Sequence, residues 1–339
     1  MPESTSKGTG TPGAPGTAES RAAAAEDAES LRGRIALVTG ATRGAGRAIA
    51  RELAAAGAEV YCTGRSTTGA PSDYGRTETV AETAELIRAA GGTAHAVTVD
   101  HRDRAEVRGL IERIDAAHGR LDILVNDIGG EAYVEFDTPL WEYDWERGMR
   151  LFEAGLLTHL ITSHAALGLL TRNPGGLVVE VTDGTRAYNA EHFRSTVFLD
   201  LTKTAVDRLA YAQGHELAGR EGTAVSVTPG WLRSETMLDA FGVTEDTWRT
   251  AAEANLGRDG ALPPYEFVIS ETPALLARGI RALAEDPARH RWNTRSVSSF
   301  ELGTHYRLTD ADGSLPDAWS FIEALETTPA AELAVDDYR

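Results

Sequence analysis

The sequence predicts an α/β domain in which a parallel sheet of seven strands carries helices on both faces. From Ile35 onward, short runs of β-branched residues alternate with amphipathic stretches that have the period of a helix. This alternation is typical of βαβ crossovers, which build parallel sheets. Turns such as Gly91-Gly92 and Pro174-Gly175-Gly176 lie where helices are expected to end. Because all the strands follow one another without a repeat, we expect a single doubly wound domain.

The predicted elements differ in apolar period, which is two for strands and three to four for helices. The strands are expected at Ile35–Thr39, Glu59–Thr63, Thr93–Val99, Ile123–Asn126, Leu177–Thr182, Ala224–Thr228 and Thr294–Ser298. The helices are expected at Gly44–Ala56, Thr77–Ala90, Arg104–His118, Pro139–Leu170, Leu199–Ala218 and Pro273–Glu285.

The chain divides into a tail, a domain and an extension. Residues 1–30 are rich in Gly, Pro, Ser, Thr, Ala and Glu and lack apolar periodicity, which is typical of a disordered tail. Residues 31–303 hold the alternating pattern. Within them, residues 232–272 form an insertion before the last predicted helix. Residues 304–339 follow as a C-terminal extension.

The composition argues against several classes of protein. The chain has 33 basic and 51 acidic residues and a net charge of -18, which disfavours nucleic acid and anionic membrane surfaces as partners. No apolar run is long enough to cross a bilayer. The only cysteine, Cys62, excludes an internal disulfide and favours a reducing, cytoplasmic location. The nine histidines are scattered without ligand spacing, so we predict no metal site.

The strongest motif is a glycine-rich turn after the first strand, which leads into the first helix. Its residues are Thr39-Gly40-Ala41-Thr42-Arg43-Gly44-Ala45-Gly46. Glycines allow the backbone to turn sharply and to approach a pyrophosphate, while the helix N-terminus supplies free N–H groups and a positive dipole end. We therefore predict a Rossmann-like dinucleotide site at Gly40, Thr42, Arg43, Gly44, Ala45 and Gly46.

The end of the second strand indicates which dinucleotide is bound. An NAD site usually has a carboxylate here to accept from the ribose 2′-hydroxyl. This sequence has Gly64 followed by Arg65 instead. A guanidinium suits a 2′-phosphate, and Arg43 is able to approach from the glycine turn. The residues therefore favour NADP(H), although the two arginines are also compatible with a merely solvated position.

The order of these motifs resembles the short-chain dehydrogenase/reductase family, classical type, over about residues 33–300. Further matching positions are Asp100, Asn126-Asp127-Ile128-Gly129, Pro229-Gly230 and Lys203. The resemblance implies that Asp100 contacts the adenine, that Asn126 and Gly129 border the ribose, and that Pro229 and Gly230 also border the cofactor. It implies that Lys203 holds the nicotinamide ribose. Lysine occurs only at Lys7 and Lys203 in this arginine-rich chain, which supports a retained role for Lys203.

The catalytic positions depart from the family, whose resemblance implies an Asn-Ser-Tyr-Lys tetrad. Leu199 stands four residues before Lys203, where the family has its tyrosine. The serine position has Asp183, or Thr182 in the adjacent register, and the asparagine position has Phe152. A general acid contributes about 10²- to 10⁴-fold to the rate, so the loss of the tyrosine requires another proton donor or a different reaction.

The substitute donor has three candidates, which are Asp183, Tyr188 and His192. Asp183 is expected beside the nicotinamide, although its carboxylate is equally compatible with a loop cap or an ion pair to Arg186. Tyr188 lies in a predicted loop, Gly184–Asn189, where packing is the alternative role. His192 is the weakest candidate, since a surface position explains it equally well.

Three functions are compatible with these residues. The first is an NADP(H)-dependent oxidoreductase for a small carbonyl or alcohol, with Asp183 or Tyr188 replacing the tyrosine. The family resemblance implies that the insertion at residues 232–272 is a lid over the substrate. Its aromatic residues, among them Trp248, Tyr265 and Phe267, favour an apolar or ring-bearing substrate. The alternatives are a non-redox lyase, isomerase or cyclase on the same scaffold, and a non-catalytic cofactor or metabolite binder. The family resemblance implies a homodimer or homotetramer.

Overall fold

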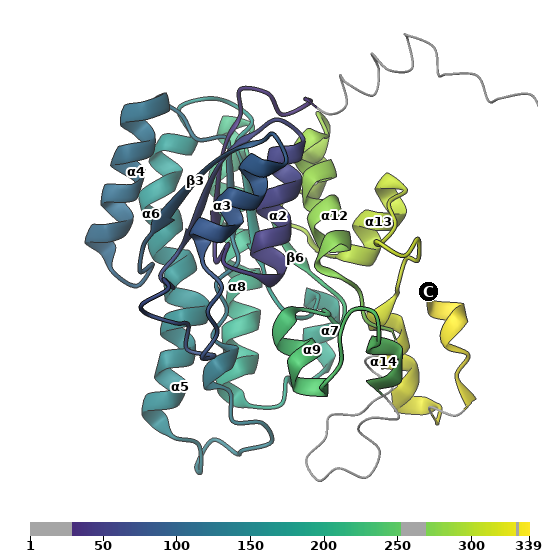
Figure 1. The fold of residues 1–339 in the computed structure, drawn as a ribbon. Helices are drawn as coiled ribbons and strands as arrows, with labels where there is room; N and C mark the ends of the chain where they lie inside the picture. Colours follow the sequence, from purple (N-terminus) through teal and green to yellow (C-terminus); the bar gives the residue numbers. More distant parts are fainter. Residues whose placement is uncertain (1–28, 252–268, 330–331) are drawn as a thin grey trace, which may run out of the picture.

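The computed structural model describes residues 29–251, 269–329 and 332–339, and these form the predicted parallel sheet with helices on both faces (Figure 1). The strand order is β3-β2-β1-β4-β5-β6-β7, and all neighbouring pairs are parallel. The strands are β1 Ile35–Thr39, β2 Glu59–Gly64, β3 Thr93–Thr98, β4 Ile123–Asn126, β5 Leu177–Val181, β6 Thr223–Thr228 and β7 Ser296–Ser298. The fold prediction is confirmed. β1 and β4 have the predicted bounds, and the ends of the other strands differ from the prediction by at most two residues.

The sheet divides the core into two apolar layers because successive side chains of a strand point to opposite faces. Ala36 and Val38 of β1 belong to the layer that also includes residues of α2, α3 and α12, whereas Ile35 and Leu37 belong to the layer with residues of α4, α6 and α8. The first set of helices covers Gly44–Ala55, Val80–Ala89 and Pro273–Glu285, and the second covers Arg104–His118, Thr158–Leu170 and Val197–Leu217. Helices therefore cover both faces of the sheet, and the central strands β1 and β4 are buried throughout.

Local capping explains why several helices begin and end where they do. Thr79 caps α3, and Asp103 caps α4 by accepting from the N–H groups of Ala105 and Glu106. Gly119 ends α4 in the left-handed conformation that glycine adopts without strain. Thr272 caps α12, whose first residue is a proline.

The stretch Pro139–Leu170 was predicted as one helical segment, and this prediction was partly wrong. The helix begins only at Trp145, and its residues 153–157 form a π-helical turn between α5 (Trp145–Phe152) and α6. Gly155 in this turn packs against Thr202 of α8, where a Cβ would be 2.8 Å from the threonine methyl. Turns of this kind often occur at functional sites.

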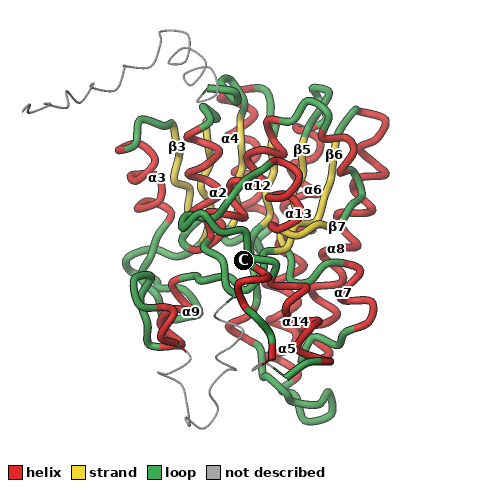
Figure 2. The backbone as a smooth tube through the Cα atoms, turned by 90° about the vertical axis from the view of Figure 1, so that its right-hand side faces the viewer, coloured by secondary structure: helices red, strands yellow, loops and turns green. Residues whose placement is uncertain are grey.

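The strands end at one edge of the sheet, and the remaining short helices gather beyond it. Figures 1 and 2 show α5, α7, α9 and α14 on this side. Four helices were not among those predicted from the sequence. They are α7 Arg186–Glu191, α9 Glu235–Phe241, α13 Ser299–Tyr306 and α14 Ala318–Thr327. The strand order reverses direction between β1 and β4, which is where doubly wound proteins bind their ligands.

Only some of the predicted domain boundaries fall within the residues that the structure describes. Residues 1–28, nearly all of the predicted tail, lie outside the described residues, as do residues 252–268 of the predicted lid, with Tyr265 and Phe267. The predicted boundary after residue 303 falls inside α13. None of the helices in the described segments combines the length and apolar character that a membrane crossing needs.

Candidate active site

The glycine turn after β1 depends on a close approach of two backbone segments. Gly40 has a φ of +70°, and a Cβ there would overlap the carbonyl group of Asp127, the residue after β4. A Cβ at Gly46 would be 2.5 Å from the carbonyl oxygen of Gly40. Only glycine fits both positions. The turn therefore directs the N-terminus of α2 toward the point where the strand order reverses.

The N-terminus of α2 holds a carboxylate. The backbone N–H of Gly44 donates to Glu235 Oε2 over 2.9 Å, and Arg43 before it provides no side-chain cap. Glu235 is the first residue of α9, so it comes from the predicted lid region. Unpaired N–H groups and the helix dipole favour a negative charge at this point. In this structure the Glu235 carboxylate occupies that position.

The two arginines predicted to distinguish the cofactor lie near the loop that follows β2. The Arg43 guanidinium stacks on the ring of Tyr74 at 4.7 Å, and Arg65 forms an ion pair with Asp73. Gly64 leaves little room for a larger residue, because a Cβ there would be 3.1 Å from the methyl group of Thr42. A larger residue at position 64 would need the side chains of Thr42 and Val80 to shift.

The side chains of two further predicted cofactor residues form hydrogen bonds with other residues of the protein. Asp100 binds Arg102 over 2.6 Å, and this hydrogen bond lowers the pKa of Asp100 despite its partial burial. Asn126 is fully buried, and its Nδ2 donates to Ser163 Oγ and to Glu180 Oε1. The amide of Asn126 therefore supports the core beneath the site.

Lys203 lies at the carboxyl edge of the sheet and binds the carboxylate of Glu131. Burial lowers the pKa of Lys203, but the charges of Glu131 and Asp183 outweigh burial, so its pKa is raised. Loss of solvent raises the pKa of Glu131, but Lys203 outweighs this effect and brings that pKa to about 2. The Glu131 carboxylate folds over Gly129, where any Cβ would overlap it.

The surroundings of Lys203 are apolar on the side of α5. Leu199, one helical turn before Lys203, is buried with Leu151 and Phe198, and Phe152 packs against this cluster. The rings of Phe152 and Phe198 meet edge to face at 5.7 Å. Thr182 Oγ1 donates to the carbonyl of Lys203 over 2.8 Å and joins α8 to the end of β5.

Asp183 faces Arg194 and is partly exposed. Its Oδ2 lies 2.5 Å from Arg194 Nη2, and 38% of its side chain is accessible to solvent. The pairing with Arg186 considered from the sequence was wrong, because Arg186 binds Asp207 of α8 over 2.8 Å. The negative charge of Asp183 contributes to the raised pKa of Lys203, so the two side chains belong to one electrostatic site.

Tyr188 lies on α7 and packs against α14, although the sequence predicted a loop at this position. Thr185 accepts from the N–H of Tyr188 and begins the short helix. The phenol ring stacks on His192 at 4.0 Å and contacts Trp319, and its pKa is raised chiefly by burial. His192 forms an ion pair with Glu326 over 2.9 Å. Both candidate donors thus have packing partners on the side of α14.

Pro229 and Gly230 contact the C-terminal part of the chain. Trp319 Nε1 donates to the Pro229 carbonyl over 3.0 Å, and Gly230 N donates to Glu271 Oε2 over 3.0 Å. Glu271 is fully buried, and burial raises its pKa to about 8. The extension that contains α14 is therefore part of the wall of the site.

Comparison with known proteins identifies the family. Residues 34–241 match the short chain dehydrogenase family. A mouse protein, dehydrogenase/reductase SDR family member 1, is 30% identical over 287 residues, which are 84% of this chain and 85% of the relative. The chain belongs to the short-chain dehydrogenase/reductase family. It is accordingly an oxidoreductase of the type that this family comprises.

Solved short-chain dehydrogenase/reductase structures show the same fold. A member from Serratia marcescens has a TM-score of 0.62 and 23% identity and covers 79% of this chain and 97% of its own. A Burkholderia cenocepacia member in complex with NADP has a TM-score of 0.59, 23% identity and the same coverages of 79% and 97%.

Sequence reasoning missed three residues at this short-chain dehydrogenase/reductase site, namely Glu131, Arg194 and Glu235. Each is a charged residue whose partner lies on another element, as for Glu131 and Lys203 or Glu235 and Gly44. The helix N-terminus signals that an anion is favoured, but no sequence pattern identifies which carboxylate supplies it.

Proposed function

We propose that this chain is an NADP(H)-dependent oxidoreductase that interconverts a small, apolar or ring-bearing alcohol and its carbonyl form. One observation carries the proposal. The N-terminus of α2 and the ammonium of Lys203 lie at the carboxyl edge of the sheet, and each binds a carboxylate of this chain. These are the kinds of group that hold the pyrophosphate and a ribose of a dinucleotide. The NADP-bound relative from Burkholderia cenocepacia supports the same assignment.

The chain fits NADP(H) better than NAD(H). The backbone turn with Gly40, Thr42, Gly44, Ala45 and Gly46 suits the pyrophosphate, and Arg43 and Arg65 suit the 2′-phosphate. Little space is available for a ribose-binding carboxylate at Gly64. The fit requires Arg65 to exchange Asp73 for the phosphate and Glu131 to leave room for the nicotinamide ribose. Asp100, Asn126, Gly129, Pro229 and Gly230 would form the remaining border.

The cofactor, when bound, supplies or accepts a hydride, and the residues of the chain move the accompanying proton. In alcohol oxidation Asp183 would accept the proton of the substrate hydroxyl, and in reduction it would return this proton to the carbonyl oxygen. Lys203 would hold the nicotinamide ribose and stabilise negative charge on the substrate oxygen. Leu199 and Phe152 keep water from this side of the site.

Asp183 is favoured over Tyr188 as the proton-transferring group. Its charge acts on Lys203, whereas Tyr188 is stacked between His192 and Trp319. The ion pair with Arg194 fixes the orientation of the Asp183 carboxylate, which accepts a hydrogen bond in this state.

The same ion pair also favours a second function, in which Asp183 removes a proton without hydride transfer. A lyase, isomerase or cyclase would use Asp183 as its base and would leave the nicotinamide unchanged. Substrate conversion without a change in NADPH absorbance would establish this second function. Cofactor binding without turnover over a broad panel of substrates would instead indicate a binder.

Exposed apolar side chains support assembly into a homodimer or homotetramer. Leu157 at the end of the π-helical turn, Leu160 on α6 and Leu201 on α8 are exposed by 40%, 48% and 51%. We propose that these helices meet their copies from a second subunit, which would remove the leucines from water. Light scattering would report the assembled mass.

The cofactor assignment predicts a selective effect of Arg65→Ala. We expect NADPH affinity to fall roughly tenfold to a hundredfold, because a charge-assisted hydrogen bond to the 2′-phosphate is lost. NADH has no such phosphate, so its affinity should change little. Quenching of protein fluorescence measures both. Asp73→Ala serves as the matched control, since it frees Arg65 and should not weaken NADPH. Equal losses for both cofactors would contradict the assignment.

Glu235→Gln is expected to strengthen NADPH binding by up to about tenfold. The glutamine retains an oxygen for the N–H of Gly44 but removes a negative charge beside the pyrophosphate position. Raised salt should reduce the difference between the two proteins. Glu245→Gln, which alters another acid of the same region, provides the control. Weaker NADPH binding by Glu235→Gln would show that Glu235 assists the cofactor and does not compete with it.

A further inference from the structure

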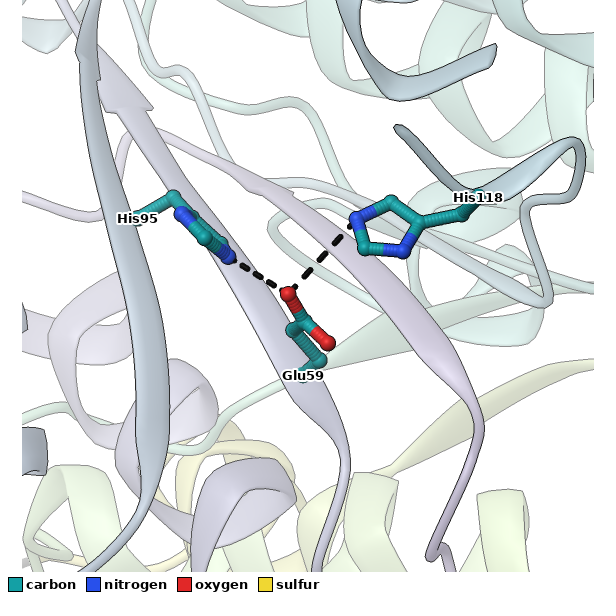
Figure 3. Close-up of side chains that lie close together, drawn as sticks. All are labelled: Glu59, His95 and His118. Carbon is teal, nitrogen blue, oxygen red and sulfur yellow. Dashed lines mark hydrogen bonds and ion pairs between the residues drawn. The ribbon is translucent and has the colours of Figure 1, made fainter. Parts of the chain in front are cut away.

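Two histidines and a glutamate converge at the end of the sheet opposite to Lys203. Glu59 is the first residue of β2, His95 lies on the neighbouring edge strand β3, and His118 is the last residue of α4. Figure 3 shows both imidazole rings directed at the same carboxylate oxygen of Glu59. The sequence predicted no metal site because these residues are far apart along the chain. The fold brings them together.

The three donor atoms have nearly the separations that a tetrahedral metal ion requires. His95 Nε2 lies 2.6 Å and His118 Nε2 3.6 Å from Glu59 Oε1, and all three atoms lie within 4.8 Å of one another. Ligands about 2.0–2.2 Å from Zn²⁺ are roughly 3.3–3.6 Å apart in a tetrahedron. Side-chain shifts of about 1 Å therefore suffice to admit an ion.

Tyr61 holds both imidazole rings in place. Its ring stacks on His95 at 4.6 Å, and its hydroxyl oxygen lies 2.8 Å from His118 Nε2. Tyr61 is 2% exposed, so its position is determined by the core. The side chains of His95, His118 and Glu59 are 34%, 17% and 31% exposed, which leaves a path for an ion from solvent.

We propose that Glu59, His95 and His118 form a site for a divalent transition metal, of which Zn²⁺ is the best match. Two imidazoles and one carboxylate are an established Zn²⁺ ligand set, with water at the fourth position. The Tyr61 hydroxyl, displaced from His118, then accepts or donates a hydrogen bond at that water. The bound metal joins the edge strand β3 to β2 and α4.

The role of this site is structural, because it lies at the opposite end of the sheet from Lys203. Edge strands have a neighbour on one side only. A metal bridge from His95 to Glu59 and His118 fixes β3 in addition to its backbone ladder. Binding to the folded state alone raises the free energy of unfolding in proportion to the logarithm of the metal concentration.

The test uses tag-free protein that has been freed of metal with a chelator. Calorimetric titration with Zn²⁺ should give one equivalent bound and a rise in Tm, and Co²⁺ should give the visible bands of a tetrahedral site. Glu59→Gln, His95→Gln and His118→Gln should each weaken binding by at least roughly a hundredfold. Tyr61→Phe should weaken it by about tenfold to a hundredfold.

His164→Gln, at an exposed histidine of α6, is the matched control and should bind as the unaltered chain does. The Tm of each variant is also measured without metal, which separates misfolding from ligand loss. Absence of stoichiometric uptake would overturn the proposal and leave a metal-free hydrogen-bond cluster. Uptake that persists in His95→Gln and His118→Gln would overturn it as well, because the metal would then be bound elsewhere.

Discussion

Asp183→Asn should lower kcat for NADP(H)-dependent turnover by about 10²- to 10⁴-fold, which is the usual contribution of a general acid or base. The asparagine has the same shape, and its oxygen is still able to accept from Arg194. It cannot take up or release the proton of the substrate hydroxyl. The affinity for NADPH should change less than about threefold, since Asp183 is assigned to the substrate. Steady-state rates and fluorescence titration measure the two effects.

Tyr188→Phe is the matched control for Asp183→Asn. The substitution removes only a hydroxyl from a ring that stacks on His192 and contacts Trp319. We expect kcat to change by less than about threefold. If Tyr188→Phe shows the large loss and Asp183→Asn does not, the proton passes through Tyr188. If neither variant loses activity, neither Asp183 nor Tyr188 takes over the proton transfer that the family tyrosine performs.

Lys203→Met should weaken NADPH binding by roughly a hundredfold or more and should abolish measurable turnover. The ammonium is assigned two hydrogen bonds to the ribose, and hydrogen bonds to charged groups contribute about 1.5–3 kcal/mol each. The change also leaves Glu131 without its cation and adds an uncompensated negative charge near the cofactor. Fluorescence titration and turnover assays test both consequences.

Two further variants separate the role of Lys203 from effects on folding. Lys203→Arg keeps the charge but replaces a compact ammonium with a planar fork, so an intermediate affinity is expected. Glu131→Gln combined with Lys203→Met removes the uncompensated charge and should recover part of the binding. The backbone contact from Thr182 to Lys203 is retained in each variant, and the Tm of each variant separates lost stability from lost binding. NADPH affinity in Lys203→Met within threefold of the unaltered chain would refute the assignment.

Much of the fold was predictable because local signals agree with one another. The apolar runs of β1 and β4 end at the predicted residues, and α12 has the predicted bounds behind its Thr272-Pro273 start. The helix after Pro139 was less predictable. A π-helical turn depends on packing of Gly155 against Thr202, which no local pattern reports.

The glycine turn was predictable from the sequence, whereas the partners of the charged side chains were not. Gly40 and Gly46 are required by contacts within the turn itself and with the residue after β4. An ion pair from Asp183 to Arg186 was one alternative considered from the sequence, yet Arg194 pairs with Asp183, and Arg186 pairs with Asp207. The short helix α7, absent from the prediction, turns Arg186 away from Asp183.

The sequence by itself determined the parallel sheet, the glycine turn and the single lysine at the carboxyl edge, because alternation, turn residues and motif order act over short stretches of chain. Only the tertiary structure decided which carboxylates meet Gly44 and Lys203, and that Glu59, His95 and His118 form a cluster. Partners of this kind are brought together by helix packing over the sheet. Their contacts therefore depend on distances and angles that no local pattern encodes.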